Sequence, residues 1–162
     1  MTKPPPALDG ALVIAFAVAD ETVKYEERQT LFINGELLGR VPKLAICRNL
    51  DETEFMVFHC NGDWEVLAVT GGYESVAAAK SRAGLSYHGI DTKWVSTGYK
   101  KEDATSYLER LFKGDSCTFC GKNPLQLEAM VQAVTVAGDT VRICNHCVDE
   151  FYSFLHAKTV DQ

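Results

Sequence analysis

Residues 55–69 read FMVFHCNGDWEVLAV, two apolar runs joined by a short polar turn. The first run ends at Cys60 and the second begins at Trp64, with Asn61-Gly62-Asp63 between them. Asn, Gly and Asp are turn residues because their backbones tolerate the dihedral angles of a tight reversal. Apolar runs of this length on either side of such a turn are typical of adjacent antiparallel strands. We therefore predict two strands here, joined by a tight turn.

The residues before this hairpin continue the same pattern. Residues 30–39 contain two apolar runs around Asn34-Gly35. Both positions of a type I′ two-residue turn need a positive φ, which Asn and Gly adopt readily, so this pair favours a hairpin. Pro42 then precedes another short apolar run at 44–47. We therefore expect residues 30–69 to form an antiparallel β-meander.

An apolar run of nine residues, ALVIAFAVA, occupies residues 11–19. Lys3 before it raises the alternative of a signal peptide, but three prolines intervene and no Ala-x-Ala cleavage pattern is present. A membrane-spanning helix needs roughly 20 apolar residues. We therefore predict a buried strand, no membrane partner and a cytoplasmic location. Residues 1–10, MTKPPPALDG, are expected to be a disordered lead.

After Gly72 the periodicity changes to that of helices. Residues 76–83 are rich in alanine and follow Ser75, a good N-cap. Residues 104–112 carry apolar side chains at helical spacing, and 92–96 suggest a short strand between the two helices. The sequence thus predicts an α+β domain over residues 11–113, an antiparallel β-meander with two helices.

The second half of the chain contains two Cys-x-x-Cys pairs, Cys117/Cys120 and Cys144/Cys147, separated by 23 residues. Four thiolates complete the tetrahedral coordination of Zn²⁺ and leave no position for a reactive water. We therefore predict one structural Zn²⁺ per chain, held by these four residues. A redox Cys-x-x-Cys pair or an iron–sulfur cluster is the alternative, and His146 is a competing ligand within the second pair.

Both pairs resemble the zinc-binding domain at the start of the bacterial ClpX unfoldase family. Residues 117–122, CTFCGK, and 141–148, VRICNHCV, carry the likeness, which covers about residues 115–156. It implies that the matching cysteines are the zinc ligands of a small treble-clef-like C4 finger over 114–162, and that the module dimerises and captures adaptors and unfolded substrates.

The resemblance has departures. The module follows another domain, Asn145-His146 replaces an acidic pair, and the predicted hairpin over 131–143 is longer. The chain has no Gly-x-x-x-x-Gly-Lys-Ser/Thr phosphate loop, so an unfoldase motor is not expected. The first domain faintly resembles an uncharacterised bacterial domain found beside such fingers, which implies no mechanism.

The zinc module carries more aromatic and aliphatic residues than a unit of its size can bury. Val148, Phe151, Tyr152 and Leu155 form one helical stripe, and Phe119 lies in the first knuckle. The stripe either packs inside the protein or binds a partner, and Phe119, Phe151 and Leu155 are the candidate contact residues. The partner would be another protein or a second copy of this chain.

Charge and the absence of catalytic motifs restrict the function classes. The net charge of -6 disfavours nucleic acid as a partner. His59 and Cys60 are adjacent in a predicted strand, so their side chains point to opposite faces and cannot form a dyad. We therefore expect no enzyme but a zinc-stabilised interaction or adaptor protein of bacterial type. The alternative is an immunity or inhibitor protein that blocks a toxin or another enzyme.

Overall fold

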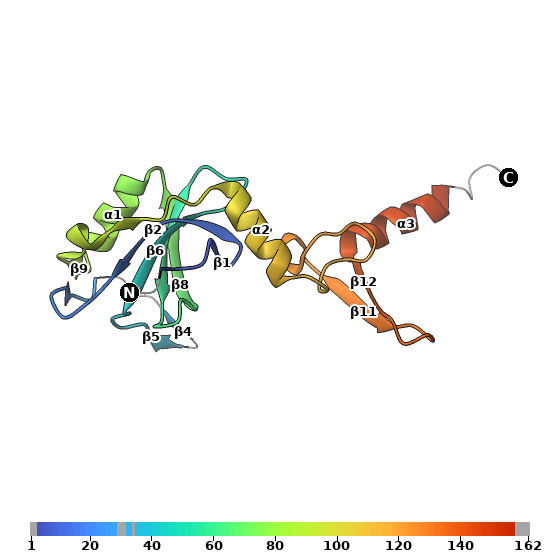
Figure 1. Cartoon of the computed structure of the whole chain (residues 1–162), viewed down its shortest axis with the longest axis horizontal. Helices are drawn as coiled ribbons and strands as arrows, with labels where there is room; N and C mark the ends of the chain where they lie inside the picture. Colours follow the sequence, from blue (N-terminus) through green and yellow to red (C-terminus); the bar gives the residue numbers. More distant parts are fainter. Residues whose placement is uncertain (1–2, 29–31, 34, 158–162) are drawn as a thin grey trace. The chain divides into compact units, whose positions relative to one another are not determined.

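The computed structural model describes residues 3–28, 32–33 and 35–157 (Figure 1). The chain divides into two compact units, Met1–Tyr107 and Leu108–Gln162. This division falls within helix α2 (Lys101–Leu111), a few residues before the boundary that the sequence suggests after Lys113.

An antiparallel sheet organises the first unit, which confirms the predicted α+β class. Its strands follow the order β1-β2-β6-β7-β8, and β10 also pairs with β2. The strands are β1 (Ala7–Leu8), β2 (Ala11–Val18), β6 (Lys43–Arg48), β7 (Phe55–Cys60), β8 (Val66–Tyr73) and β10 (Val95–Ser96). Strands β6, β7 and β8 form the meander, and the predicted turn at 61–63 joins β7 to β8.

Two short two-stranded pairs lie outside this sheet. Strand β3 (Lys24–Tyr25) pairs with β9 (Tyr87–His88), and β4 (Phe32–Ile33) pairs with β5 (Glu36–Leu37). The predicted hairpin within 30–39 is therefore present, but it is not part of the main meander. Asn34 lies outside the described residues, whereas Gly35 has the positive φ of 84° that the predicted turn requires.

The N-terminal residues differ from the expected disordered lead. From Lys3 onward they are ordered, and β1 pairs with β2 through Leu8↔Ala11. Asp9 and Gly10, with φ of 43° and 84°, form a two-residue turn of the kind that Asp-Gly favours. The expectation of disorder was wrong because the prolines stiffen a segment that docks: Pro4 is buried, and its carbonyl accepts a hydrogen bond from the Tyr99 hydroxyl at 3.0 Å.

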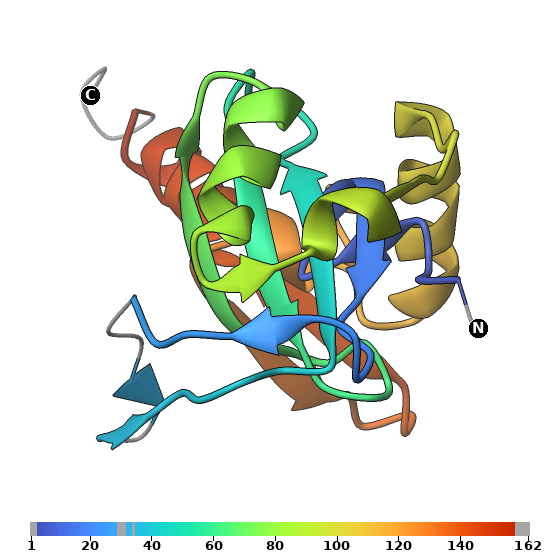
Figure 2. The same cartoon turned by 90° about the vertical axis from the view of Figure 1, so that its left-hand side faces the viewer.

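Helix α1 (Val76–Gly84) covers one face of the sheet (Figure 2). The Ser75 hydroxyl accepts a hydrogen bond from the Ala78 amide at 3.0 Å, as predicted for the N-cap. Ala79 and Ala83 face the sheet and are buried, so the small side chains allow close packing. The strand expected at 92–96 is shorter in the structure, where only Val95–Ser96 form β10. Its first two residues, Thr92 and Lys93, belong to a 3-10 turn, η1 (Ile90–Lys93).

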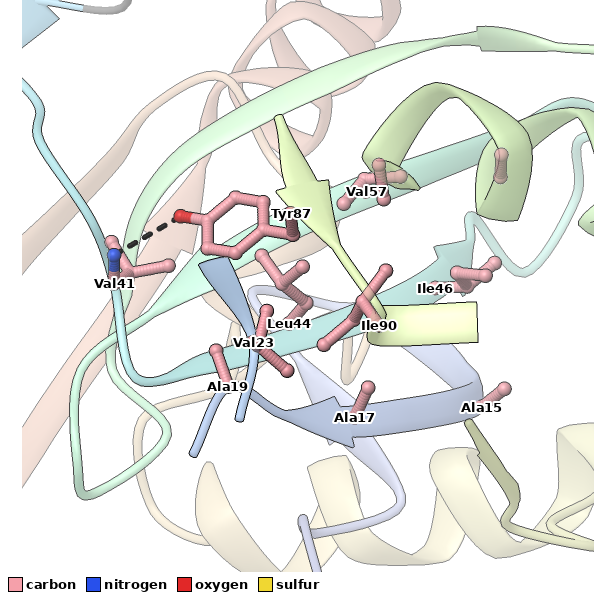
Figure 3. Packing of buried hydrophobic residues seen from close by; sticks show 12 residues of the cluster. Ala15, Ala17, Ala19, Val23, Val41, Leu44, Ile46, Val57, Tyr87 and Ile90 are labelled. Atoms are coloured by element: carbon pink, nitrogen blue, oxygen red, sulfur yellow. Dashed lines mark hydrogen bonds between the residues drawn. The ribbon is translucent and has the colours of Figure 1, made fainter. Parts of the chain in front are cut away.

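The core lies on both faces of the sheet. On the α1 side, Leu44 and Ile46 pack with Tyr87 and Ile90 (Figure 3). The Tyr87 hydroxyl also accepts a hydrogen bond from the Val41 amide at 3.0 Å. Ala45 and Cys47, which alternate with them along β6, are buried on the opposite side. Since both faces of β6 are covered, this strand is the centre of the unit.

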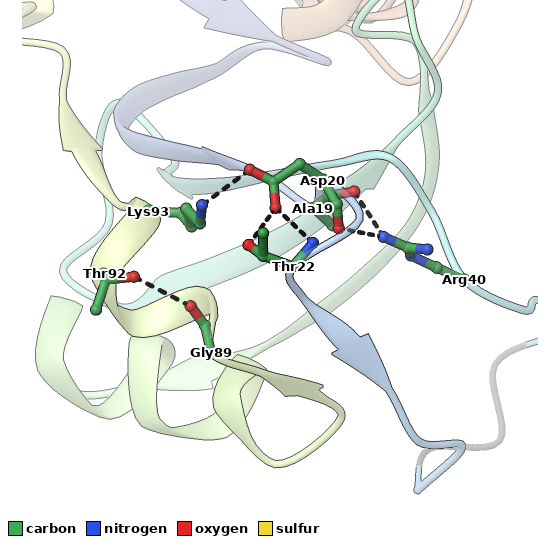
Figure 4. A network of polar contacts seen from close by, with 7 residues as sticks. All are labelled: Ala19, Asp20, Thr22, Arg40, Gly89, Thr92 and Lys93. Atoms are coloured by element: carbon green, nitrogen blue, oxygen red, sulfur yellow. Dashed lines mark hydrogen bonds and ion pairs between the residues drawn. The ribbon is translucent and has the colours of Figure 1, made fainter.

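A polar network fixes the loop after β2 (Figure 4). The Asp20 carboxylate accepts hydrogen bonds from Lys93 at 2.8 Å and from the Thr22 amide at 3.0 Å. These contacts lower the pKa of Asp20 to about 2, and the hydrogen bond from Lys93 has the largest effect. Arg40 donates to the carbonyl groups of Ala19 and Asp20, so the network closes the end of the strand.

His59 predicts a pH dependence of the stability of this unit. Burial lowers the pKa of His59 to about 4, and its Nε2 has no hydrogen-bond partner among the described residues. Above about pH 6.5, the usual pKa of an exposed histidine, His59 is neutral in both the folded and the unfolded state. As the pH falls from 6.5 towards 4, only the unfolded state gains the proton, so the free energy of unfolding should decrease, by about 2 kcal/mol at pH 5.

The measurement is urea unfolding at about pH 7 and pH 5, followed by the fluorescence of Trp64 and Trp94, the two tryptophans of the chain. We expect His59→Leu to remove most of the difference between the two pH values. If His59→Leu retains the wild-type difference, other groups cause the pH dependence.

Candidate metal centre

The four cysteines lie at the junctions of short elements in the second unit. This unit contains η2 (Pro124–Gln126), β11 (Met130–Val134), β12 (Thr140–Cys144) and α3 (Asn145–Ala157). Strands β11 and β12 form the predicted hairpin. Cys144 is the last residue of β12, and Cys147 lies in the first turn of α3. The strand-to-helix transition therefore presents both thiols of the second pair.

The first pair lies in a tight knuckle. The Gly121 amide donates to the Cys117 carbonyl at 2.9 Å, and Gly121 has a φ of 74° that a residue with a side chain rarely adopts. The Cys117 amide in turn donates to the Lys122 carbonyl at 2.9 Å. These bonds turn the chain so that Cys117 and Cys120 face the same point.

Arg142 connects the knuckle to the hairpin. Its carbonyl accepts a hydrogen bond from the Thr118 amide at 2.8 Å, and its amide donates to the Thr118 hydroxyl at 2.9 Å. The guanidinium also pairs with Asp115 at 3.1 Å and donates to the Gly114 carbonyl. This role of Arg142 is not evident from the sequence, where its only sign is an arginine two residues before Cys144.

The four sulfur atoms are arranged as a single metal ion requires. All four lie within 4.8 Å of one another. The Sγ–Sγ distance is 3.9 Å between Cys117 and Cys147, and 3.6 Å between Cys120 and Cys144. A zinc–sulfur bond of 2.3 Å in a tetrahedron places sulfur atoms about 3.8 Å apart. The geometry is therefore able to hold one ion and is consistent with one structural Zn²⁺.

Electrostatics also favours a cation at this point. Burial raises the pKa of Cys147, and the neighbouring sulfurs raise it further. Burial also opposes the charge on Cys117, but backbone hydrogen bonds from Cys120, Phe119 and Cys144 outweigh it and lower its pKa to about 6. Because four adjacent thiolates repel one another, a divalent cation is needed for all four to be ionised together.

The surroundings indicate a structural site. Cys117, Cys144 and Cys147 are buried, and Leu127 and Met130 are among the apolar side chains packed against them. His146 is exposed, and within the described ranges the four cysteines form the metal-capable group without it. The His146 alternative therefore finds no support in the geometry.

Two of the three predicted contact residues, Phe119 and Phe151, meet beside the candidate metal centre. The rings of Phe119 and Phe151 meet edge to face, with centroids 5.3 Å apart. Both rings are nevertheless about half exposed, at 55% and 43%, and Leu155, one turn further along α3, is 65% exposed. We call Phe119, Phe151 and Leu155 the aromatic surface. The structure thus brings the first knuckle and the helix together on one exposed surface.

His59 and the two remaining cysteines, Cys47 and Cys60, lie in the first unit. Cys60 and Cys47 belong to the buried cluster of the sheet. Burial raises the pKa of Cys60 to about 12 and that of Cys47 well above its ordinary value. Both thiols are therefore neutral at physiological pH. The His59 ring lies next to the ring of Tyr87, with centroids 6.3 Å apart.

None of the helices in the described ranges combines the length and the hydropathy that a bilayer crossing requires. Comparison with models of protein families, with curated proteins and with solved structures finds no match to this chain.

Proposed function

We propose that this chain is a zinc-stabilised, non-catalytic protein that binds other proteins through its aromatic surface. The observation that carries the proposal is the exposure of Phe119 and Phe151, whose rings meet beside the candidate metal centre, together with that of Leu155 one turn further along α3. Zinc would act by holding two knuckles and a helix in a fixed arrangement, so that the contact residues are positioned before binding. Pre-organised aromatic side chains are typical of protein contact surfaces.

The rest of α3 supports an apolar contact. Val148, Tyr152 and Phe154 are also exposed, at 44%, 64% and 61%. Single exposed apolar residues are ordinary, but a contiguous group on one helix is typical of a binding surface. The helix thus offers apolar area on either side of the Phe119–Phe151 contact.

Charge supports a protein partner over a nucleic acid. Residues 115–162 carry six acidic and three basic side chains, and the whole chain has a net charge of -6. Phosphate backbones would be repelled by such a surface. The partner is then another protein, which is either the target of an adaptor or a second copy of this chain. An inhibitor of a toxin or enzyme would use the same kind of contact.

The proposal predicts a large effect of one charge at Phe151. Removal of a buried aromatic contact residue typically costs about 2 kcal/mol or more, which is roughly a thirtyfold loss of affinity. Proteins captured by the wild-type chain from its own cells would be purified, and their Kd measured by titration calorimetry. We expect Phe151→Glu to raise the Kd at least thirtyfold while zinc content stays unchanged.

Ser153→Glu is the matched control, because it places the same charge on an exposed position of the same helix. It should leave the Kd within a few fold of wild type. Equal affinities of the Phe151→Glu and wild-type chains would show that α3 is not the contact surface. The first unit would then become the leading candidate for the contact, and inhibition the better interpretation.

A further inference from the structure

The four cysteines of the metal centre differ in how open they are to solvent. Cys117, Cys144 and Cys147 are 2%, 0% and 3% exposed, whereas Cys120 is an exposed residue. The apolar side chains that cover the metal centre, such as Leu127, pack against the three buried cysteines, and among the described residues Cys120 is not part of this cluster. The metal centre is therefore shielded at three of its ligands and accessible at the fourth.

The conformation of the first knuckle explains this opening. Residues 118–122, which include Cys120, are all exposed. At Gly121, which follows Cys120, the position of a side chain would have no described atom within 4 Å other than those of its own chain neighbours. The hydrogen bonds between Cys117 and its partners Gly121 and Lys122 close the knuckle through its backbone. They fix its shape without covering Cys120.

Metal binding makes access, and not ionisation, the difference between the four cysteines. All four sulfurs must be thiolates to bind a divalent cation together. The thiolate is also the form of cysteine that oxidants attack, and the susceptibility of a thiolate increases with its exposure. Cys120 should therefore react before the other three. Cys47 and Cys60 are buried in the first unit and should not react.

We propose that Cys120 is a site of oxidation by hydrogen peroxide, and that its oxidation opens the metal centre. Cys144 is its resolving partner, because the two sulfur atoms are 3.6 Å apart. A small movement of the exposed knuckle brings them to the bonded distance of about 2.05 Å. This inference concerns the chemistry of the four cysteines, so it does not depend on whether the aromatic surface binds another protein.

The reaction has two steps. The Cys120 thiolate attacks one oxygen of hydrogen peroxide, an S–O bond forms as the O–O bond breaks, and the hydroxide that leaves takes up a proton to become water. The Cys144 thiolate then attacks the sulfenic acid sulfur, an S–S bond forms as the S–O bond breaks, and a second hydroxide leaves and is protonated. The two thiolates lose two electrons in total, and one hydrogen peroxide with two protons becomes two waters. With two of four donors lost, the centre can no longer hold the ion.

Mapping of the first disulfide in the zinc-bound, full-length chain tests the proposal without any substitution. The chain would be treated with less than one equivalent of hydrogen peroxide, alkylated and digested with trypsin. Trypsin cleaves after Lys122 and Arg142, so a Cys120–Cys144 disulfide joins two peptides, and fragmentation in the mass spectrometer locates the bond. We expect this disulfide first, with the other four cysteines alkylated. A first disulfide between any other two cysteines overturns the proposal.

Zinc release, followed with a chromogenic chelator, tests the same site kinetically. Histidine can replace cysteine as a zinc ligand, so Cys120→His removes the exposed thiol and retains a donor. We expect it to release zinc at least about tenfold more slowly than the wild type in about 1 mM hydrogen peroxide. Cys147→His, which replaces a buried ligand and leaves Cys120 in place, is the matched control and should release zinc as fast as the wild type.

A reducing agent and added zinc should restore the metal content of the oxidised wild type, because a disulfide is reversible. Equal release rates of the two histidine variants would overturn the proposal, as would a wild-type chain that keeps its zinc under these conditions. If either variant fails to bind zinc, the position of the first disulfide in the wild type decides alone.

Discussion

Cys144→Ser is expected to abolish zinc binding and unfold the second unit. Cys144 is completely buried, ends β12, and lies 3.6 Å from the Cys120 sulfur. Its sulfur also accepts a hydrogen bond from the Cys147 amide at 3.4 Å. Serine supplies a hydroxyl in place of the thiolate that zinc prefers. Structural zinc contributes roughly 10–16 kcal/mol in small zinc-dependent folds, so a unit this small should not remain folded without it.

The measurements are metal analysis and limited proteolysis. The wild type should contain about one equivalent of zinc, because four thiolates complete one tetrahedral site. Cys144→Ser should contain almost none, and protease should cleave within 115–157 while the first unit survives. Cys60→Ala, which removes a buried thiol outside the metal centre, is the control and should retain the metal. Full zinc content in the Cys144→Ser protein would refute the assignment.

Leu44→Ala is expected to destabilise the first unit by about 2–5 kcal/mol, the usual range for a leucine removed from a core. The Leu44 side chain has no exposed surface and lies on the central strand β6, between the sheet and the layer that contains Tyr87 and Ile90. The loss combines the missing apolar contacts with a cavity that a closely packed layer cannot fill.

Urea unfolding followed by tryptophan fluorescence measures this effect, because Trp64 and Trp94 both belong to the first unit. Leu85→Ala, at a position 43% exposed, is the control and should change the free energy of unfolding by less than about 1 kcal/mol. The zinc content of Leu44→Ala should be unchanged. Loss of zinc in this variant would mean that the two units share one cooperative fold.

The two substitutions together test whether the units are thermodynamically independent. If they are, the zinc-binding unit is a separable module, and a chain that ends at Lys113 should unfold cooperatively. Independence also matters for the proposed function, because a contact surface on the second unit would then work without any change in the first.

Local sequence patterns determined the metal centre and many of the elements. The spacing of the four cysteines identified the whole metal-capable cluster, because each Cys-x-x-Cys knuckle can present two thiols to one tetrahedral ion. Ser75 marked the start of α1, and the polar turn at 61–63 marked the β7–β8 connection. The Ser75 cap, the polar turn and each Cys-x-x-Cys knuckle join residues only a few positions apart, so short segments contain the information.

Only the tertiary structure decided which strands pair. The sequence did not reveal that β1 docks on β2, that the β4–β5 hairpin lies outside the main sheet, or that β8 continues through Gly71-Gly72. The register Phe55↔Tyr73 shows why β8 is long: the beginning of β7 supplies a partner for residues that look like a turn. Arg142 acquires its role in the same way, from a knuckle 24 residues away. Strand pairing is satisfied by backbone groups common to every residue, so its partners depend on which apolar faces meet in the folded chain.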